Sequence, residues 1–387
     1  MENPKIRFKG FTKDWEQRKF SDIASRESIS RESSYDLPSL EYEDVIAEEG
    51  RLNKDISLKE NIKKGIVFDG SQVLYGKLRP YLHNWLNPDF SGVAVGDWWV
   101  LKPNNADKSF IYRLIQTQRF DDIANQSAGS KMPRADWNLV SNTEFAVPVS
   151  QEEQEKIGEY FSSLDHLITL HQRKCEQTKN LKKYMLQKMF PQNGAKVPEI
   201  RFNGFTHDWE QRKFGEVFQE YSEKNHPELP ALTIIQGGGT VLREESDRNL
   251  QYNKSSLSGY KMVCENDFIV HLRSFEGGLE KSNHKGLISP AYHTFHGDNV
   301  DSRFYYPYFR SYEFIKHKLV PHVYGIRDGR SIDIDGMKTI EIPYTSYEEQ
   351  KKIGDYIQSL DHLITLHQRH TDFYKKTSCY FISCVYV

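Results

Sequence analysis

The sequence EEQEKIGEYFSSLDHLITLHQR at residues 152–173 returns at 348–369 as EEQKKIGDYIQSLDHLITLHQR, with 18 of 22 positions identical. A second pair, PKIRFKGFTKDWEQRKF at 4–20 and PEIRFNGFTHDWEQRKF at 198–214, agrees at 14 of 17 positions. The stretch that separates the two motifs in each half has diverged almost completely. A duplication that keeps its frame while its inserts vary indicates one scaffold that presents two different surfaces.

The longer motif is predicted to be helical in both copies. Its apolar side chains recur at spacings of four and three residues, which is typical of a long amphipathic helix with a coiled-coil seam. Pro148 precedes the first copy and Pro191 follows it, as helix boundaries often require. We expect the two stripes to bury each other through the seam residues Ile157, Phe161, Leu164, Ile168, Ile353, Ile357, Leu360 and Ile364.

Length and composition indicate two α/β (α+β) domains related by a pseudo-two-fold repeat. The 387 residues and the repeat offset of 194–196 suit two domains of roughly 150–200 residues. Short β-prone runs punctuated by Gly, Pro and Asn predict mixed inserts. With 52 Lys and Arg against 54 Asp and Glu, any polyanion site must be a local patch. We predict domains at 1–150 and 193–346, and long helices at 151–192 and 347–387.

Several function classes lack their sequence signatures. The four cysteines have no CxxC spacing and no signal peptide is present, so we expect a reduced, cytoplasmic protein without a structural metal. No apolar run approaches the ~18–20 residues that span a membrane. Gly237-Gly238-Gly239-Thr240 lacks the lysine of a phosphate loop and suits a hairpin turn instead. We find no nuclease, methyltransferase or nucleophile motif, and expect no catalytic residue and no bound cofactor.

Comparing the halves with each other identifies shared basic residues. At an offset of 194, Leu78-Arg79 aligns with Leu272-Arg273, and at 196 the pattern Gly-x-Lys/Arg-x-x-Arg recurs after Gly129 and Gly325. Arginine and lysine near a glycine turn suit phosphate contacts, although they could equally pair with carboxylates or cap helices. The predicted phosphate contacts are Arg79, Lys131, Arg134, Arg273, Arg327 and Arg330.

Residues that choose bases must differ between copies that read different bases. The candidates therefore lie beside the shared anchors at unlike positions: Tyr75 and Lys77 in the first copy, and His271, Ser274 and Glu276 in the second.

Taken together, the motifs resemble the specificity subunit of type I restriction-modification systems. DWEQRKF opens each variable domain, a VPV- or IPY-type strand closes it, and the EEQ helix follows before the unit repeats over nearly the whole chain. The resemblance implies two target recognition domains, each reading one half of a bipartite asymmetric site in double-stranded DNA. It also implies that the two helices form an antiparallel spacer between them.

The resemblance further implies partner subunits. Two modification (methyltransferase) subunits would carry S-adenosylmethionine, and restriction subunits would supply translocation and cleavage driven by ATP and Mg. This chain would then be a reader without catalysis. Two alternatives stay open: a self-contained DNA methyltransferase or nuclease, and a duplicated interaction scaffold unrelated to DNA.

The second copy departs from the first after Arg369. Residues 370–387 read HTDFYKKTSCYFISCVYV where residues 174–192 read KCEQTKNLKKYMLQKMFPQ. Aromatic and β-branched residues replace helix formers, so we expect a truncated or altered second helix that loses about half its length. Its β-prone, uncharged end would be prone to aggregate if exposed.

Overall fold

The computed structural model describes residues 4–57, 59, 61–126, 132–192, 194–245, 254–325 and 331–386. The chain forms two compact units: unit 1 is Met1–Arg173 with Gln368–Val387, and unit 2 is Lys174–His367. Both combine helices with sheets, which confirms the predicted α/β class. The finer predicted division at residues 150, 192 and 346 stays a prediction.

Unit 1 is built on two four-stranded sheets. Their strand orders are β2-β11-β8-β9, comprising Ala24–Arg26, Trp98–Pro103, Val73–Gly76 and Trp85–Leu86, and β3-β7-β10-β4, comprising Ser30–Glu32, Lys64–Phe68, Gly92–Ala94 and Ser39–Leu40. Two further antiparallel pairs are β1 (Glu16–Lys19) with β12 (Glu144–Val147), and β5 (Val45–Ile46) with β6 (Arg51–Leu52). The short helices are α1 (Phe20–Ile23), α2 (Lys108–Leu114), α3 (Gln118–Ala124) and α4 (Trp137–Asn142).

Unit 2 combines, among its described residues, one four-stranded sheet with two-stranded pairs. Its four-stranded sheet has the order β14-β21-β18-β19, comprising Gln219–Tyr221, His293–His296, Phe268–Val270 and Glu280–Lys281. The two-stranded pairs are β13 (Glu210–Lys213) with β24 (Glu341–Tyr344), β15 (Leu232–Ile235) with β16 (Gly239–Leu242), β17 (Lys261–Val263) with β20 (Gly286–Ile288), and β22 (Val323–Tyr324) with β23 (Ser331–Ile332). The short helices are α6 (Phe214–Val217), α7 (Ser274–Gly277), α8 (Ser302–Phe309) and α9 (Ile334–Lys338).

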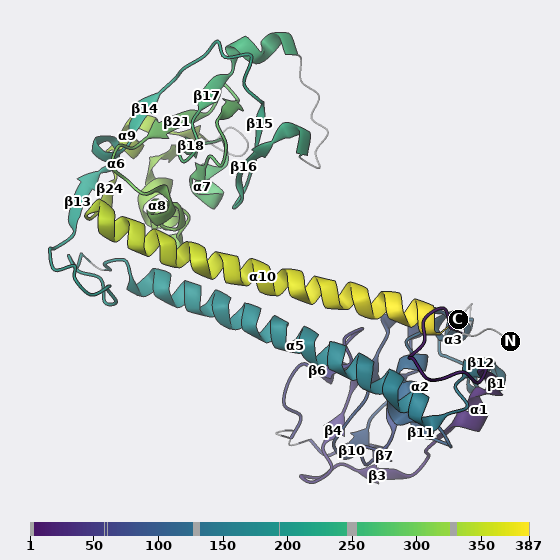
Figure 1. Cartoon of the computed structure of the whole chain (residues 1–387). Helices are drawn as coiled ribbons and strands as arrows, with labels where there is room; N and C mark the ends of the chain where they lie inside the picture. Colours follow the sequence, from purple (N-terminus) through teal and green to yellow (C-terminus); the bar gives the residue numbers. More distant parts are fainter. Residues whose placement is uncertain are drawn as a thin grey trace. The chain divides into compact units, whose positions relative to one another are not determined.

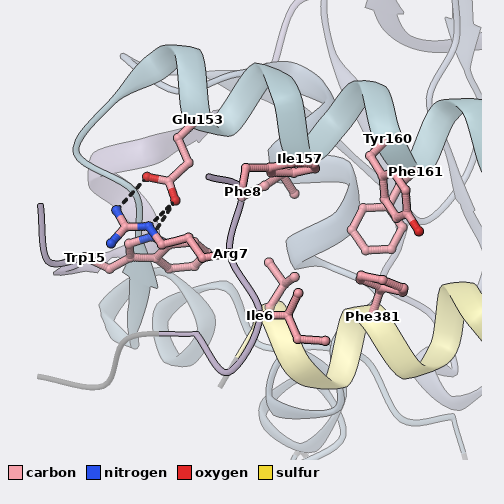
Figure 2. A pocket seen from close by; sticks show the side chains of 10 residues that line it. Ile6, Arg7, Phe8, Trp15, Glu153, Ile157, Tyr160, Phe161 and Phe381 are labelled. Carbon is pink, nitrogen blue, oxygen red and sulfur yellow. Dashed lines mark hydrogen bonds and ion pairs between the residues drawn. The ribbon is translucent and has the colours of Figure 1, made fainter. Parts of the chain in front are cut away.

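In each unit, a buried glutamate near the start of a long helix binds the shorter repeated motif. In unit 1, Glu153 accepts a hydrogen bond from Arg7 Nε at 2.6 Å and one from Trp15 Nε1 at 3.2 Å (Figure 2). In unit 2, the corresponding Glu349 accepts from Arg201 Nε at 2.7 Å and from the Trp209 indole at 3.1 Å. The repeated motifs therefore meet in space, and their identity reflects one interaction used twice.

The two long helices are α5 (Gln151–Lys188, 38 residues) and α10 (Tyr347–Val385, 39 residues), both labelled in Figure 1. Within unit 1, Tyr160 packs on Phe381 with ring centroids 5.1 Å apart, and His171 packs on Tyr374 at 5.7 Å. Rising numbers in α5 thus meet falling numbers in α10, so the segments are antiparallel. Within unit 2 the same sense holds, because Cys175 lies against the Ile364 carbonyl and Lys182 pairs with Asp361 at 2.5 Å.

Most of the predicted seam residues are buried, and the mutual burial of the two stripes stays a prediction. Six of the eight are buried, while Ile168 and Ile364 are half-buried. Ile157, Phe161 and Leu164 belong to the core of unit 1, whereas Ile353 and Ile357 belong to the core of unit 2. Five of the eight seam residues therefore pack into a domain core. The first turns of both helices are thus part of the domains.

The expected loss of half the second helix is wrong. Helix α10 continues to Val385, which is buried in the core of unit 1, and Tyr386 packs against Phe110 with centroids 5.2 Å apart. Phe190, at an offset of 196, packs against Phe304 in unit 2 at 4.9 Å. The apolar pattern Met185, Leu186, Met189, Phe190 recurs as Phe381, Ile382, Val385, Tyr386. Core packing therefore overrides the β propensity of this end.

Candidate nucleic-acid interface

In unit 1, two loops that carry predicted anchors lie side by side. Lys77 and Arg79 follow the end of β8, and Arg134 lies in the segment before α4. The Arg79 amide donates to the Pro133 carbonyl at 2.7 Å, and the Ala135 amide donates to the Lys77 carbonyl at 2.8 Å. The structure thus brings Lys77 and Arg79 close to Arg134, which lies more than fifty positions further along the sequence.

Asp97 neutralises two of these cations. Arg134 donates to both Asp97 carboxylate oxygens, at 3.2 and 3.1 Å, and Lys77 Nζ lies 3.5 Å from the same carboxylate. The hydrogen bonds from Arg134 hold the pKa of Asp97 below its usual range. For these two residues the carboxylate-pairing interpretation fits the observed contacts. Arg79 differs: it is exposed, has a left-handed backbone (φ 49°) and forms no ion pair with the residues that the structure describes.

The predicted reader Tyr75 is a core residue. Its side chain is 1% exposed, stacks on Trp99 at 5.6 Å and meets Phe120 edge-on at 5.2 Å. A base could not reach Tyr75 without opening the sheet, so this side chain is not part of a DNA-binding surface.

In unit 2, Arg273 lies in the position that corresponds to Arg79, just after β18 and before α7. It is exposed, as is the neighbouring Leu272. Ser274 is fully buried and its hydroxyl accepts a hydrogen bond from the His271 amide at 2.9 Å. Ser274 therefore shapes the backbone before α7 and is also left out of the interface. Glu276 is exposed on the same short helix.

His271 is largely enclosed and uncharged at neutral pH. Its Nδ1 accepts from the Arg273 amide at 3.3 Å, and its Nε2 is buried without a hydrogen bond among the described atoms. Burial, followed by the nearby Arg310 and Arg273, lowers the pKa of His271 to about 4. His271 is thus poorly suited to a charged contact with phosphate.

The depressed pKa predicts a pH dependence of stability. Between pH 6.5 and 4 the unfolded chain binds a proton at His271 that the folded chain does not, so folding stability falls as the pH falls through this window. We expect about 1–2 kcal/mol to be lost at pH 5. In denaturant titrations, His271→Gln should lose correspondingly less than the unchanged chain between pH 7 and 5, while the exposed His284→Gln should behave like the unchanged chain. Equal losses in all three would contradict this account.

Three predicted anchors, Lys131, Arg327 and Arg330, lie outside the described residues.

A hydrogen-bond network that no sequence pattern predicted lies in unit 2, where the buried Glu280 contacts the β15–β16 turn. The hairpin predicted at Gly237–Gly239 is confirmed, since Ile235 pairs with Gly239. Its partner Glu280 could not be found from the sequence, because residues far apart in the chain meet there.

A cavity in unit 1 is lined mainly by apolar side chains such as Ile6, Phe8 and Tyr160, and its charged groups, Arg7 and Glu153, are paired with each other (Figure 2). Over the described ranges, no three His, Cys, Asp or Glu side chains are grouped to hold a metal. No helix of this part of the chain is long and apolar enough to cross a membrane.

Comparisons with known proteins agree with this architecture. Residues 12–180 match the family model of the type I restriction modification DNA specificity domain. The type I restriction enzyme MjaVIII specificity subunit of Methanocaldococcus jannaschii is 25% identical over 287 residues, which cover 69% of this chain and 66% of that protein, just under two thirds of its length.

Solved structures are also similar. The type I restriction-modification system S subunit from M. genitalium shares the fold, with a TM-score of 0.61 and 12% identity over 100% of this chain and 99% of that one. The HsdS subunit from Thermoanaerobacter tengcongensis aligns over 96% of both chains at 17% identity, with a TM-score of 0.45. The chain is thus similar to type I restriction-modification specificity subunits, and its residues 12–180 match the DNA specificity domain of that family.

Proposed function

We propose that this chain is the DNA-reading subunit of a type I restriction-modification complex. Each unit would contact one half of a bipartite site in double-stranded DNA. The observation that carries the proposal is the pair Arg79 and Arg273, two exposed arginines kept at corresponding strand ends in inserts that otherwise differ. Exposed arginines suit phosphate oxygens, which fix the register of a protein on DNA, while the surrounding unlike residues can choose bases.

The same proposal assigns the chemistry to partners. Two modification subunits would bring S-adenosylmethionine, restriction subunits would bring ATP- and Mg-dependent cleavage, and the complex would work in the cytoplasm. Sequencing methylated adenines in cells with and without this chain tests the proposal directly. A two-part motif that appears only with the chain supports it, whereas methylation that does not depend on the chain would refute it.

Removing either arginine should weaken DNA binding without unfolding the protein. We expect Arg79→Ala and Arg273→Ala each to lower the affinity of the assembled complex for all sequences and to reduce the slope of log K against log salt by about 1. The measurement is a fluorescence anisotropy titration at several salt concentrations.

Each unit offers a matched control for this experiment. Arg51 and Arg212 are partly exposed but pair with the nearby Glu49 at 2.6 Å and Glu210 at 2.7 Å. Arg51→Ala and Arg212→Ala should leave the salt slope unchanged. If they reduce it as much as the other two variants, Arg79 and Arg273 are not phosphate contacts.

A further inference from the structure

A fully buried carboxylate in unit 2 ties the tip of a hairpin to a helix. Glu280 accepts hydrogen bonds from the backbone amides of Gly237 at 2.7 Å and Gly239 at 3.1 Å. The same carboxylate accepts from the Tyr306 hydroxyl at 2.7 Å and from the Arg310 guanidinium. A buried ion pair contributes little net stability, because desolvation offsets its attraction. Here its effect is to fix the geometry of the β15–β16 turn.

The rest of the turn is also held in one conformation. Asn283 donates from its side-chain amide to the Gly238 carbonyl at 2.8 Å and to the Thr240 carbonyl at 3.1 Å. Gly237 and Gly239 have φ values of 82° and 74°, which favour glycine, and a Cβ at Gly239 would lie 2.5 Å from a backbone oxygen. Because both the amides and the carbonyls of this turn are held, its side chains lose little conformational entropy on binding a partner.

Gln236 is the side chain that this rigid turn presents. It is exposed and forms no hydrogen bond with the described residues. Its amide lies over Gly277, since a Cβ added there would fall 2.1 Å from Gln236 Nε2. Gly277 ends α7, the helix that begins directly after the exposed Arg273. An uncommitted amide and a phosphate-binding cation are thus carried by adjoining elements.

The residue of unit 1 at the same sequence offset is chemically different. At the offset of 194 that aligns Arg273 with Arg79, Gln236 falls on Tyr42. The Tyr42 hydroxyl is committed, because it donates to the Asp97 carbonyl at 2.5 Å and accepts from the Leu78 amide at 3.2 Å. Two units that read different half-sites require such unlike side chains beside like anchors.

We propose that Gln236 is a specificity-determining residue of unit 2, whose side-chain amide pairs with an adenine edge in the major groove, and that Glu280 is its positioning residue. A carboxamide offers one donor and one acceptor, which match N7 and the N6 amino group of adenine. The inference rests on the proposed DNA-reading function and names one of its contacts.

The test is methylation-motif sequencing in cells that express the full chain with its modification partner. Gln236→Ala should relax the preference for adenine at one position of one half-site by about tenfold, and leave the other half-site unchanged. Glu280→Gln should relax the same position to a smaller extent, which a general loss of stability would not do. Gln211→Ala, an exposed glutamine on β13, should leave the motif as it is.

The outcomes separate the two levels of the proposal. An unchanged motif with Gln236→Ala overturns the inference and leaves the DNA-reading function standing. Loss of methylation at every site by a normally folded Gln236→Ala variant also overturns it, because one base contact should affect one position. If the unchanged chain directs no motif, the proposed function fails and this inference fails with it.

Discussion

A chain that lacks residues 378–387 is expected to unfold in unit 1. This segment supplies Phe381, Val385 and Tyr386 to the unit 1 core, and the Cys384 carbonyl accepts a hydrogen bond from the Lys5 amide at 2.9 Å. Burying each large apolar side chain stabilises by about 1.5–3 kcal/mol, so the combined loss approaches the about 5–15 kcal/mol that holds a typical domain together. Hydrogen exchange followed by mass spectrometry should show loss of protection over unit 1.

A pair of tyrosines gives the matched point test. Tyr386, directly after the end of α10, packs edge-on against Trp15 at 6.4 Å, whereas Tyr380, on the last turns of α10, is 59% exposed. Tyr386→Ala should lower the free energy of unfolding by about 2–4 kcal/mol, and Tyr380→Ala by less than about 0.5 kcal/mol. Similar costs for both, or full protection in the shortened chain, would mean that the end of α10 is not part of the core.

Replacing Glu153 should destabilise unit 1 strongly, because this residue of α5 binds Arg7 and Trp15 near the start of the chain. Glu153 is 1% exposed, and its removal takes away the carboxylate to which Arg7 and the Trp15 indole both donate, while Arg7 keeps its hydrogen bond to the Lys13 carbonyl. Breaking a buried pair from one side costs about 3–5 kcal/mol, and we expect about 3 because Arg7 retains some contact with water. Urea unfolding of Glu153→Ala measures this cost.

The neighbouring glutamates serve as controls in both units. Glu152→Ala changes the same kind of residue one position away, where the side chain is 68% exposed, and should cost less than about 0.5 kcal/mol. Glu349→Ala and the exposed Glu348→Ala repeat the comparison in unit 2. Should Glu153→Ala and Glu152→Ala prove equally mild, the buried glutamate would not stabilise unit 1.

The repeated motifs made the long helices predictable, whereas the environments of individual residues in the diverged inserts could not be predicted. The long helices followed from the spacing of apolar residues, and the hairpin followed from its run of glycines. Tyr75 was predicted to contact a base, but it lies on β8, a strand between β11 and β9. All four residues of β8 are buried, so neither face of this strand is exposed. The pairing of Arg134 with Asp97 joins loops 37 residues apart, which no local pattern records.

The prediction of a shortened second helix was wrong for a related reason. Its residue types favour strands, but Val385 and Tyr386 occupy places equivalent to Met189 and Phe190, and the apolar positions rather than the residue types carry the information. An intrinsic preference of this kind is small beside the burial of a core side chain.

Because unit 1 is discontinuous in sequence, its synthesis begins before that of unit 2 but its folding should finish later. Unit 2 has all its residues once the ribosome has passed His367, whereas unit 1, begun first, still waits for Gln368 onward. Nascent domains usually fold from the amino end. Here the half of the molecule that emerges first should be the last to become protease-resistant, and until then Trp15 and Phe110 lack the side chain that covers them.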